Sequence, residues 1–237
     1  MKTNFSLSLI LSNAWDALKA NFWVLLGIVI AYMLLSFIIS LLQAGGGFVG
    51  FIVGLLSIVL SIIFGLGYTR MCLDAAAGKE PQFSSFQEQL PKFWRYLGLS
   101  FLIGFAAVIW MILTLFIVII VSGASAGGPG DFMVALATAG AFGLLLFFVL
   151  QIPLIYLVIR LQFGALFIVD TDCGVFESLR KSWALTQGYE LKLFLLMLVM
   201  MGLCIAGVIA LIVGVFVAAV LVSLMQVVAY KQLTTQE

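Results

Sequence analysis

The sequence predicts an all-α, polytopic membrane protein with six transmembrane helices in three hairpins, each preceded by a cytoplasmic amphipathic interfacial helix. Three observations support this prediction. Hydrophobic residues make up 65% of the 237 positions and charged residues only 9%, whereas soluble proteins average roughly 25% charged residues. Uncharged apolar runs of about 20 residues, the length that crosses a bilayer, recur along the chain. The basic residues gather near one end of these runs. A water-soluble fold of this length could not bury so much apolar surface, so we expect the surroundings to be largely lipid.

The first three expected spans have clear boundaries. The first covers residues 22–42 and ends at the glycines of 45–47, which favour a turn. The second covers 48–69 and ends at Arg70. The third covers 97–121 and is followed by a segment rich in Gly and Ser.

The fourth expected span is long and contains a proline. As one straight helix, residues 132–169 would extend about 57 Å, nearly twice the hydrocarbon thickness of roughly 30 Å. Pro153 lies near the middle and predicts a kink or break. Gln151 beside it could bond a carbonyl group that the proline frees. Gln151, Pro153 and Arg160 are therefore a candidate functional kink and polar site.

Two interpretations of Arg160 stay open at this point. In the first, Arg160 marks the cytoplasmic edge of the membrane with its long stem snorkelling, and residues 161–169 follow the interface. In the second, Arg160 lies deeper and pairs with a carboxylate, for which the candidates are Asp74, Asp170 and Asp172.

The last apolar run must contain two spans. Residues 191–230 carry Lys192 as their only charge, and one helix of this length would extend about 60 Å. We therefore expect the chain to fold back near residues 210–214, which gives six spans in total.

The distribution of positive charge supports this count. With both termini on one side, the loops near 43–47, 122–131 and 210–214 face the other side, and none of them contains Lys or Arg. The positive-inside rule makes the basic side cytoplasmic. We thus expect a multi-pass protein of the bacterial cytoplasmic (inner) membrane with cytoplasmic N and C termini. The basic residues are Lys2, Lys19, Arg70, Lys79, Lys92, Arg95, Arg160, Arg180, Lys181, Lys192 and Lys231.

Three repeat modules, at about residues 3–69, 82–160 and 172–233, form the single integral membrane domain of residues 1–237. Each module begins with a segment of apolar residues at helical spacing, and each such segment carries a Trp (Trp15, Trp94 or Trp183) near a span, where an amphipathic ring suits the headgroup region. Ser85 and Glu88 are spaced as a capping box at the start of the second interfacial helix. The three apolar stripes are Leu7, Leu11, Trp15, Leu18 and Phe22; Phe83, Phe86, Leu90, Phe93 and Leu97; and Phe176, Leu179, Trp183 and Thr186.

The same interfacial helices supply the candidate contacts to anionic lipid headgroups or to a partner protein. Basic and aromatic side chains at the membrane surface attract anionic lipids. These candidates are Trp15, Lys19, Lys92, Trp94, Arg95, Arg180, Lys181 and Trp183.

Small residues spaced four apart predict where spans pack, because close helix contact in lipid uses small side chains. We expect helix packing at Gly50, Gly54, Ser57, Ser61, Gly202, Ala206 and Ala210.

Composition excludes several kinds of chemistry. The sequence has no His, which removes His-based catalysis and His-containing metal sites. Cys72, Cys173 and Cys204 lie far apart without metal-ligand spacing, and a net charge of +1 gives no case for nucleic-acid binding. We predict no catalytic residues, no metal and no cofactor.

Part of the sequence resembles a known family. The chain resembles the glycerophosphodiester phosphodiesterase membrane-domain group and related bacterial integral membrane proteins of unknown function. The resemblance is found at Arg160, 163–170 and 177–188, and also at 77–83 and Phe86. In some members such a region precedes a soluble phosphodiesterase domain. The metal-binding carboxylates and histidines of that enzyme have no counterpart here, so the resemblance implies a membrane module without its own catalysis.

These observations favour a non-enzymatic integral membrane protein that contacts the bilayer and other membrane subunits. It would be an accessory or organising subunit of a membrane complex, or a module of the lipid environment. The alternatives are a small-solute or lipid translocator that uses the kinked fourth span and, least favoured, a lipid-modifying enzyme.

Overall fold

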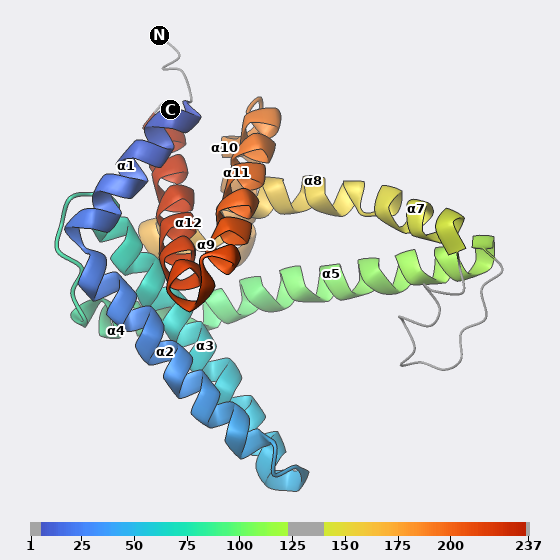
Figure 1. The fold of residues 1–237 in the computed structure, drawn as a ribbon, viewed down its shortest axis with the longest axis horizontal. Helices are drawn as coiled ribbons and strands as arrows, with labels where there is room; N and C mark the ends of the chain where they lie inside the picture. The colour runs from blue at the N-terminus through green and yellow to red at the C-terminus, as the bar shows by residue number, and fades with distance from the viewer. Residues whose placement is uncertain (1–5, 123–139, 236–237) are drawn as a thin grey trace.

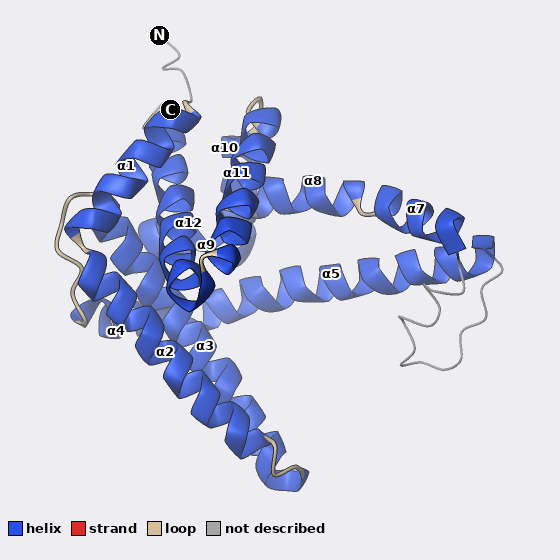
Figure 2. Ribbon diagram, in the orientation of Figure 1, coloured by secondary structure: helices blue, strands red, loops and turns tan. Residues whose placement is uncertain are grey.

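The computed structural model describes residues 6–122 and 140–235, and this part of the chain is helical without strands (Figures 1 and 2). The turn expected after the third span lies almost wholly outside the described residues. The helices are α1 (Leu7–Ala20), α2 (Phe22–Gln43), α3 (Gly47–Ala76), α4 (Ser84–Gln89), the 3-10 turn η1 (Leu90–Lys92), α5 (Phe93–Ser122), α7 (Gly140–Leu150), α8 (Ile152–Leu161), α9 (Gly164–Thr171), α10 (Val175–Thr186), α11 (Glu190–Ile209) and α12 (Leu211–Thr234).

Six helical stretches of the described chain are long and apolar enough to cross a membrane. This confirms the expected number of candidate spans. They are Phe22–Gln43, Gly47–Ala76, Ser84–Val121, Gly140–Thr171, Glu190–Ile209 and Gly214–Thr234.

Two of the expected interruptions are present. The fourth stretch breaks at Gln151, between α7 and α8, and Pro153 occupies the first turn of α8. Proline is tolerated there because it has no N–H to donate. The fold-back between α11 and α12 is at Ala210, within the expected turn.

The second apolar stretch extends beyond the end that the charge of Arg70 predicted. We expected it to end at Arg70, but α3 continues to Ala76. An ion pair between Arg70 and Asp74, one helical turn apart (3.4 Å), supports the extension. Gly78, with a positive φ of 71°, follows the helix end.

The packed core of the described chain lies where the ends of the spans meet the shorter helices. It is built from α1, the start of α2, the end of α3, α9, and parts of α8, α10, α11 and α12. Helix α9 lies at its centre: Phe163, which precedes this helix, and Ile168 and Val169 within it are fully buried. Helix α9 is enclosed by α3, α5 and α10, and the expectation that residues 161–169 follow the membrane interface stays a prediction.

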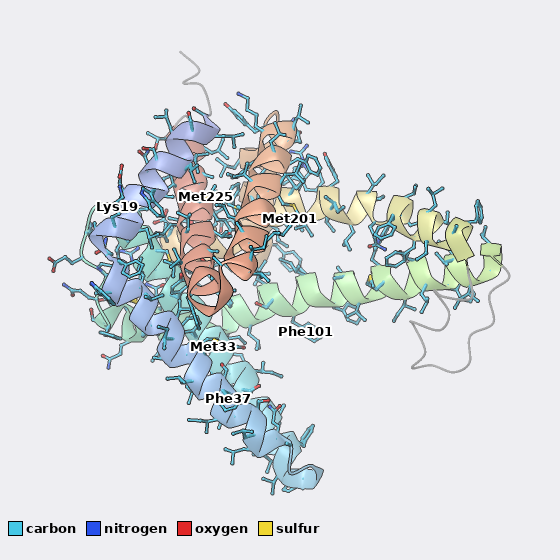
Figure 3. All side chains as sticks on the ribbon, viewed as in Figure 1. Lys19, Met33, Phe37, Phe101, Met201 and Met225 are labelled. Carbon is cyan, nitrogen blue, oxygen red and sulfur yellow. The ribbon has the colours of Figure 1, made fainter. Side chains whose placement is uncertain are left out.

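Two helix pairs extend away from this core. Helix α2 lies beside α3, and α5 lies beside α7, and the two pairs point in different directions (Figure 1). Their outer parts expose large apolar side chains, including Met33 and Phe37 on α2 and Phe101 on α5 (Figure 3).

Helices α1 and α10 bury faces that differ from their apolar stripes. Helix α1 turns Ile10, Ala14 and Leu18 inward against α12, while Leu11 and Trp15 stay exposed. Helix α10 buries Ser178, Ser182, Leu185 and Thr186, and leaves Phe176 and Trp183 exposed. Small hydroxyl side chains allow α10 to approach the backbone of α8 and α9 closely, which larger apolar residues would prevent.

The capping box expected at Ser85 and Glu88 is absent. Helix α4 begins at Ser84, so Ser85 lies within its first turn and not at the N-cap, and the helix has no side-chain cap. The Ser85 amide donates to the Gln82 carbonyl (3.2 Å), and its side chain is buried in the fold. The hydroxyl of Ser85 is therefore not in a capping position.

Small residues behave differently in the two places where we expected packing. Gly50 lies against the Gln43 carbonyl, which a Cβ would approach to 3.1 Å, and Gly54 lies near the Gln43 side chain. On α11, however, Gly202 and Ala206 are exposed, so the packing expected there is wrong within the described chain.

The close contact between α11 and α12 lies next to their turn instead. A Cβ on Gly207 would lie 2.7 Å from the Cβ of Ala218, and one on Gly214 would lie 2.5 Å from the Cβ of Ala210. Ala210 lies at this turn and is exposed too, although its Cβ is close to Gly214. Gly202 lies further from the turn with no atom within 4 Å of its Cβ position. Ser57 and Ser61 line a small cavity of about 270 Å³ between α2 and α3, and the Ser61 hydroxyl donates to the Ile58 carbonyl of its own helix (2.8 Å).

Gly67 gives a direct test of how α4 docks on α3. A Cβ there would lie 2.2 Å from the Phe86 ring, so Gly67→Ala must displace α4. We expect the free energy of unfolding to fall by about 1–3 kcal/mol, as for other overpacked sites. Thermal unfolding of the purified protein in detergent measures the change.

Gly27→Ala is the matched control, because no atom lies within 4 Å of a Cβ at that position of α2. Alanine favours a helix over glycine by up to about 1 kcal/mol, so this variant should be as stable as the original or slightly more stable. Equal melting temperatures for the two variants would contradict the described packing of Phe86.

Candidate functional site

The candidate site is centred on Arg160, in the last turn of α8. Its side chain is only 7% exposed. Arginine stays protonated in proteins, so the fold has to compensate a full buried charge.

Side chains from the start of α11 and from α8 bind the guanidinium group. Nη2 donates to Glu190 Oε1 at 2.6 Å and to the Tyr156 hydroxyl at 2.8 Å, and Nε donates to the same hydroxyl at 3.0 Å. Nη1 lies 3.4 Å from both the Trp183 carbonyl and the Thr186 hydroxyl on α10. The charge is thus shared among three helices, as buried charges require.

Two aromatic rings complete this environment. The guanidinium carbon lies 5.1 Å from the centroid of the Tyr156 ring and 4.9 Å from that of the Trp183 ring. The two rings meet edge to face. Cation–π attraction is stronger where water is excluded, so these contacts add to the stabilisation of the buried charge.

The backbone around Arg160 is fixed by Ser182 of α10. The Ser182 hydroxyl donates to the Arg160 carbonyl (2.7 Å) and accepts from the Phe163 amide (3.2 Å). Both backbone groups lie at the turn between α8 and α9, where helical hydrogen bonds end. One buried hydroxyl therefore fixes the angle between these helices.

Glu190 is a partner that the sequence analysis did not identify. Of the candidates named there, Asp74 pairs with Arg70, Asp172 pairs with Arg95, and Asp170 accepts a hydrogen bond from Tyr230. Arg160 does pair with a carboxylate, as the second interpretation expected, but the partners named there are wrong, and the depth of Arg160 in the membrane stays a prediction. The position of Glu190 in the sequence was the available signal. Glu190 is the first residue of the span that follows α10, and the start of that span lies at the same level as the end of α8.

Gln151 and Pro153 do not join this site. They precede Arg160 by nine and seven residues, about 10–14 Å along a helix. The Gln151 amide nitrogen has no hydrogen-bond partner among the described residues. The carbonyl of Leu150 at the break is instead bound by the indole N–H of Trp110 on α5 (3.1 Å).

Two cations predicted to meet headgroups also bind the end of α9. Lys92 donates to the Val169 carbonyl (2.6 Å), and Arg95 donates to the carbonyl and carboxylate of Asp172 (2.7 Å each). The last carbonyl groups of a helix lack intrahelical donors and carry partial negative charge, which explains these contacts. Lys231 binds the Leu73 carbonyl near the end of α3 in the same way (2.7 Å).

The other predicted headgroup contacts lie at the surface of the described chain. Trp15, Trp94 and Trp183 are exposed, Trp94 most of all at 76%. Lys19 is exposed near the Trp15 ring, and Arg180 is exposed too. Lys181 pairs with Glu177 at 2.8 Å, and this hydrogen bond lowers the pKa of the Glu177 carboxyl.

Metal ligation finds no support in the described part of the chain. No group of three His, Cys, Asp or Glu residues there could hold an ion. Cys72, Cys173 and Cys204 are free, the first two of them buried.

Removing either member of the Arg160–Glu190 pair should destabilise the fold. Arg160→Met or Glu190→Gln leaves a buried group without its charged partner, a loss of roughly 3–5 kcal/mol for fully buried pairs. Glu190 is partly exposed (35%), so we expect about 3 kcal/mol or less, measured by thermal unfolding in detergent.

The double variant supplies the decisive comparison. Arg160→Met with Glu190→Gln should be less destabilised than the sum of the single variants, because neither charge is left alone. The exposed pair Glu177–Lys181 is the control, and its equivalent cycle should show little coupling. Additive losses at Arg160 and Glu190 would show that their pairing does not hold these helices together.

Comparison with known proteins identifies a family. No curated protein and no solved structure matches this chain. No link to the glycerophosphodiester phosphodiesterase membrane-domain group is shown. A family model described as "Protein of unknown function (DUF975)" matches residues 9–237, nearly the whole sequence, and the chain therefore belongs to this family.

Proposed function

We propose that this protein is a non-enzymatic accessory subunit that organises a membrane complex. The observation that carries the proposal is the uncovered apolar surface on the outer parts of α2, α3 and α5. Phe37, Phe51 and Phe101 are each more than 60% exposed there. Large contiguous apolar surfaces of this kind mark contacts with lipid or with other proteins.

The arrangement of the helix pairs supports this role. The pairs α2–α3 and α5–α7 diverge from the core (Figure 1), so neighbouring molecules would occupy the space between them. We propose that these pairs and α11–α12 cross the membrane as three hairpins. In this arrangement, α1, α4 and α10 lie at the cytoplasmic face of a bacterial inner membrane, and both termini are cytoplasmic.

The charged groups of the candidate site also favour a structural role over catalysis. Arg160, Arg95 and Lys92 are each bound to partners within the fold, where they join helices. A lipid-modifying enzyme remains the least favoured alternative.

A module of the lipid environment is the second candidate, and a specific observation favours it. Trp15, Trp94 and Trp183 are all exposed although they lie on three different helical segments. Tryptophan prefers the headgroup level of a bilayer. Exposed Lys19 and Arg180 would add attraction for anionic lipids.

Translocation through the kinked fourth span gains less support. A cavity beside α8 is lined on that helix by Leu154, Leu157, Val158 and Leu161. This lining suits an apolar solute or lipid chain and would not replace the hydration of a polar solute.

Site-specific crosslinking in native membranes tests the accessory role. A photoreactive amino acid is placed at Phe37 or at Phe101, both on exposed outer faces, or at Met225, which is buried (Figure 3). The tagged protein is then purified in lipid nanodiscs. We expect a foreign membrane subunit in fixed stoichiometry, crosslinked from positions 37 and 101.

Position 225 is the internal control, because its side chain is 1% exposed and should crosslink only within the chain. Recovery of the chain alone, with lipid as the sole adduct at positions 37 and 101, would refute the accessory role. That result would favour the lipid-environment module instead.

A further inference from the structure

An apolar cavity separates α5 from α8 near the core. Its volume is about 460 Å³, and its walls are almost wholly apolar. It lies on the core side of the Trp110–Leu150 contact that joins α5 to the break in the fourth span. The lining includes Ile103, Gly104 and Ala107 from α5, and Leu157 and Leu161 from α8.

A second, polar cavity adjoins the first. It has a volume of about 280 Å³ and lies between α3, α9 and α12. Tyr96, Gln162 and Ala165 line both cavities, so these residues form the boundary between an apolar compartment and a polar one. The combined shape is amphipathic.

Two donors of the polar cavity lack a well-formed hydrogen bond within the described chain. The Gln162 amide nitrogen is buried without a partner, and the buried Tyr68 hydroxyl has only the Cys72 thiol and the Ser223 hydroxyl beside it, neither in good hydrogen-bond geometry. Two other polar side chains of the cavity form hydrogen bonds: Gln226 donates to the Gln162 carbonyl (3.1 Å), and Ser223 donates to the Ala219 carbonyl (2.9 Å). Buried donors are normally paired, so these two are available to an acceptor that enters the cavity.

The lining of the polar cavity also limits the charge of such an acceptor. Its residues are Tyr68, Thr69, Cys72, Tyr96, Gln162, Ala165, Leu166, Ser223, Gln226 and Val227. This set contains no Lys or Arg to compensate a phosphate or carboxylate, and burying an uncompensated charge is costly. An ester carbonyl or a hydroxyl fits better.

We propose that the two cavities form one binding site for a lipid with a single acyl chain and an uncharged, hydrogen-bond-accepting head. The head accepts from Tyr68 and Gln162 between α3, α9 and α12. The acyl chain lies between α5 and α8 and contacts Gly104. This site is independent of the accessory role, because it uses internal surfaces that the outer helix faces do not share.

Binding of 1-monooleoylglycerol to the purified full chain in detergent tests the site, with native mass spectrometry as the readout. We expect one molecule per chain. Gly104→Phe fills the apolar cavity without a backbone clash, since no atom lies within 4 Å of a Cβ there, and should weaken binding by at least about tenfold. Gly202→Phe is the matched control, because Gly202 is equally free of neighbours but lies on α11, and it should bind like the original.

The head contacts have their own control in a separate cavity. Tyr68→Phe and Gln162→Leu should each weaken binding by roughly twofold to tenfold, the loss of one neutral hydrogen bond. Ser61→Ala removes a hydroxyl that bonds its own helix beside the cavity between α2 and α3 and should have no effect. Melting temperatures of all variants confirm that each is folded.

Three results would overturn the proposal. Equal binding by Gly104→Phe and Gly202→Phe would show that the lipid only coats the outer surface. Equal binding by the Tyr68 and Gln162 variants and by Ser61→Ala would show that the polar cavity holds water alone. Tighter binding of anionic oleoyl lysophosphatidylglycerol than of monooleoylglycerol would exclude an uncharged head.

Discussion

The rest of the structure depends on the burial of Arg160. A guanidinium group cannot lose its charge by a pKa shift, as a buried lysine or carboxylate can, so its partners must be held in place. Glu190, Tyr156 and the residues around Trp183 meet this requirement from α11, α8 and α10. The end of the fourth apolar stretch is thereby joined to the start of the fifth, and Ser182 fixes the turn that leads into α9.

This constraint explains why the core lies at one end of the long helices. Polar groups there bind one another, and Lys92, Arg95 and Lys231 bind carbonyl groups near the ends of α9 and α3. Lipid provides no hydrophobic force between apolar helices, so the outer parts of α2, α3 and α5 need no cover from the same chain. The polar end holds the molecule together, and the apolar parts are available to lipid or to other subunits. The amphipathic cavity lies between these two regions.

The sequence predicted those features that depend on local length and composition. Six apolar stretches, the break near Pro153 and the fold-back at Ala210 follow from helix length and proline chemistry. The buried face of α10 could not be predicted from its apolar stripe, because lipid and protein both favour apolar side chains. Trp183 therefore faces outward while Ser182 faces inward. Glu190 was not predicted as the partner of Arg160, which lies 30 residues earlier in the sequence. Pairing over that distance depends on how the spans are arranged in space, and the periodicity of apolar residues does not specify that arrangement.

Membrane topology tests the central claim, that the charged core occupies one side of the bilayer and the helix pairs return to it. Compartment-sensitive reporters fused after Glu237 and inserted in the 45–47 glycine turn measure this in intact cells. We predict a cytoplasmic signal from the reporter after Glu237 and a periplasmic signal from the glycine turn. A periplasmic signal from Glu237 would mean an odd number of crossings, and the three-hairpin arrangement would then be wrong.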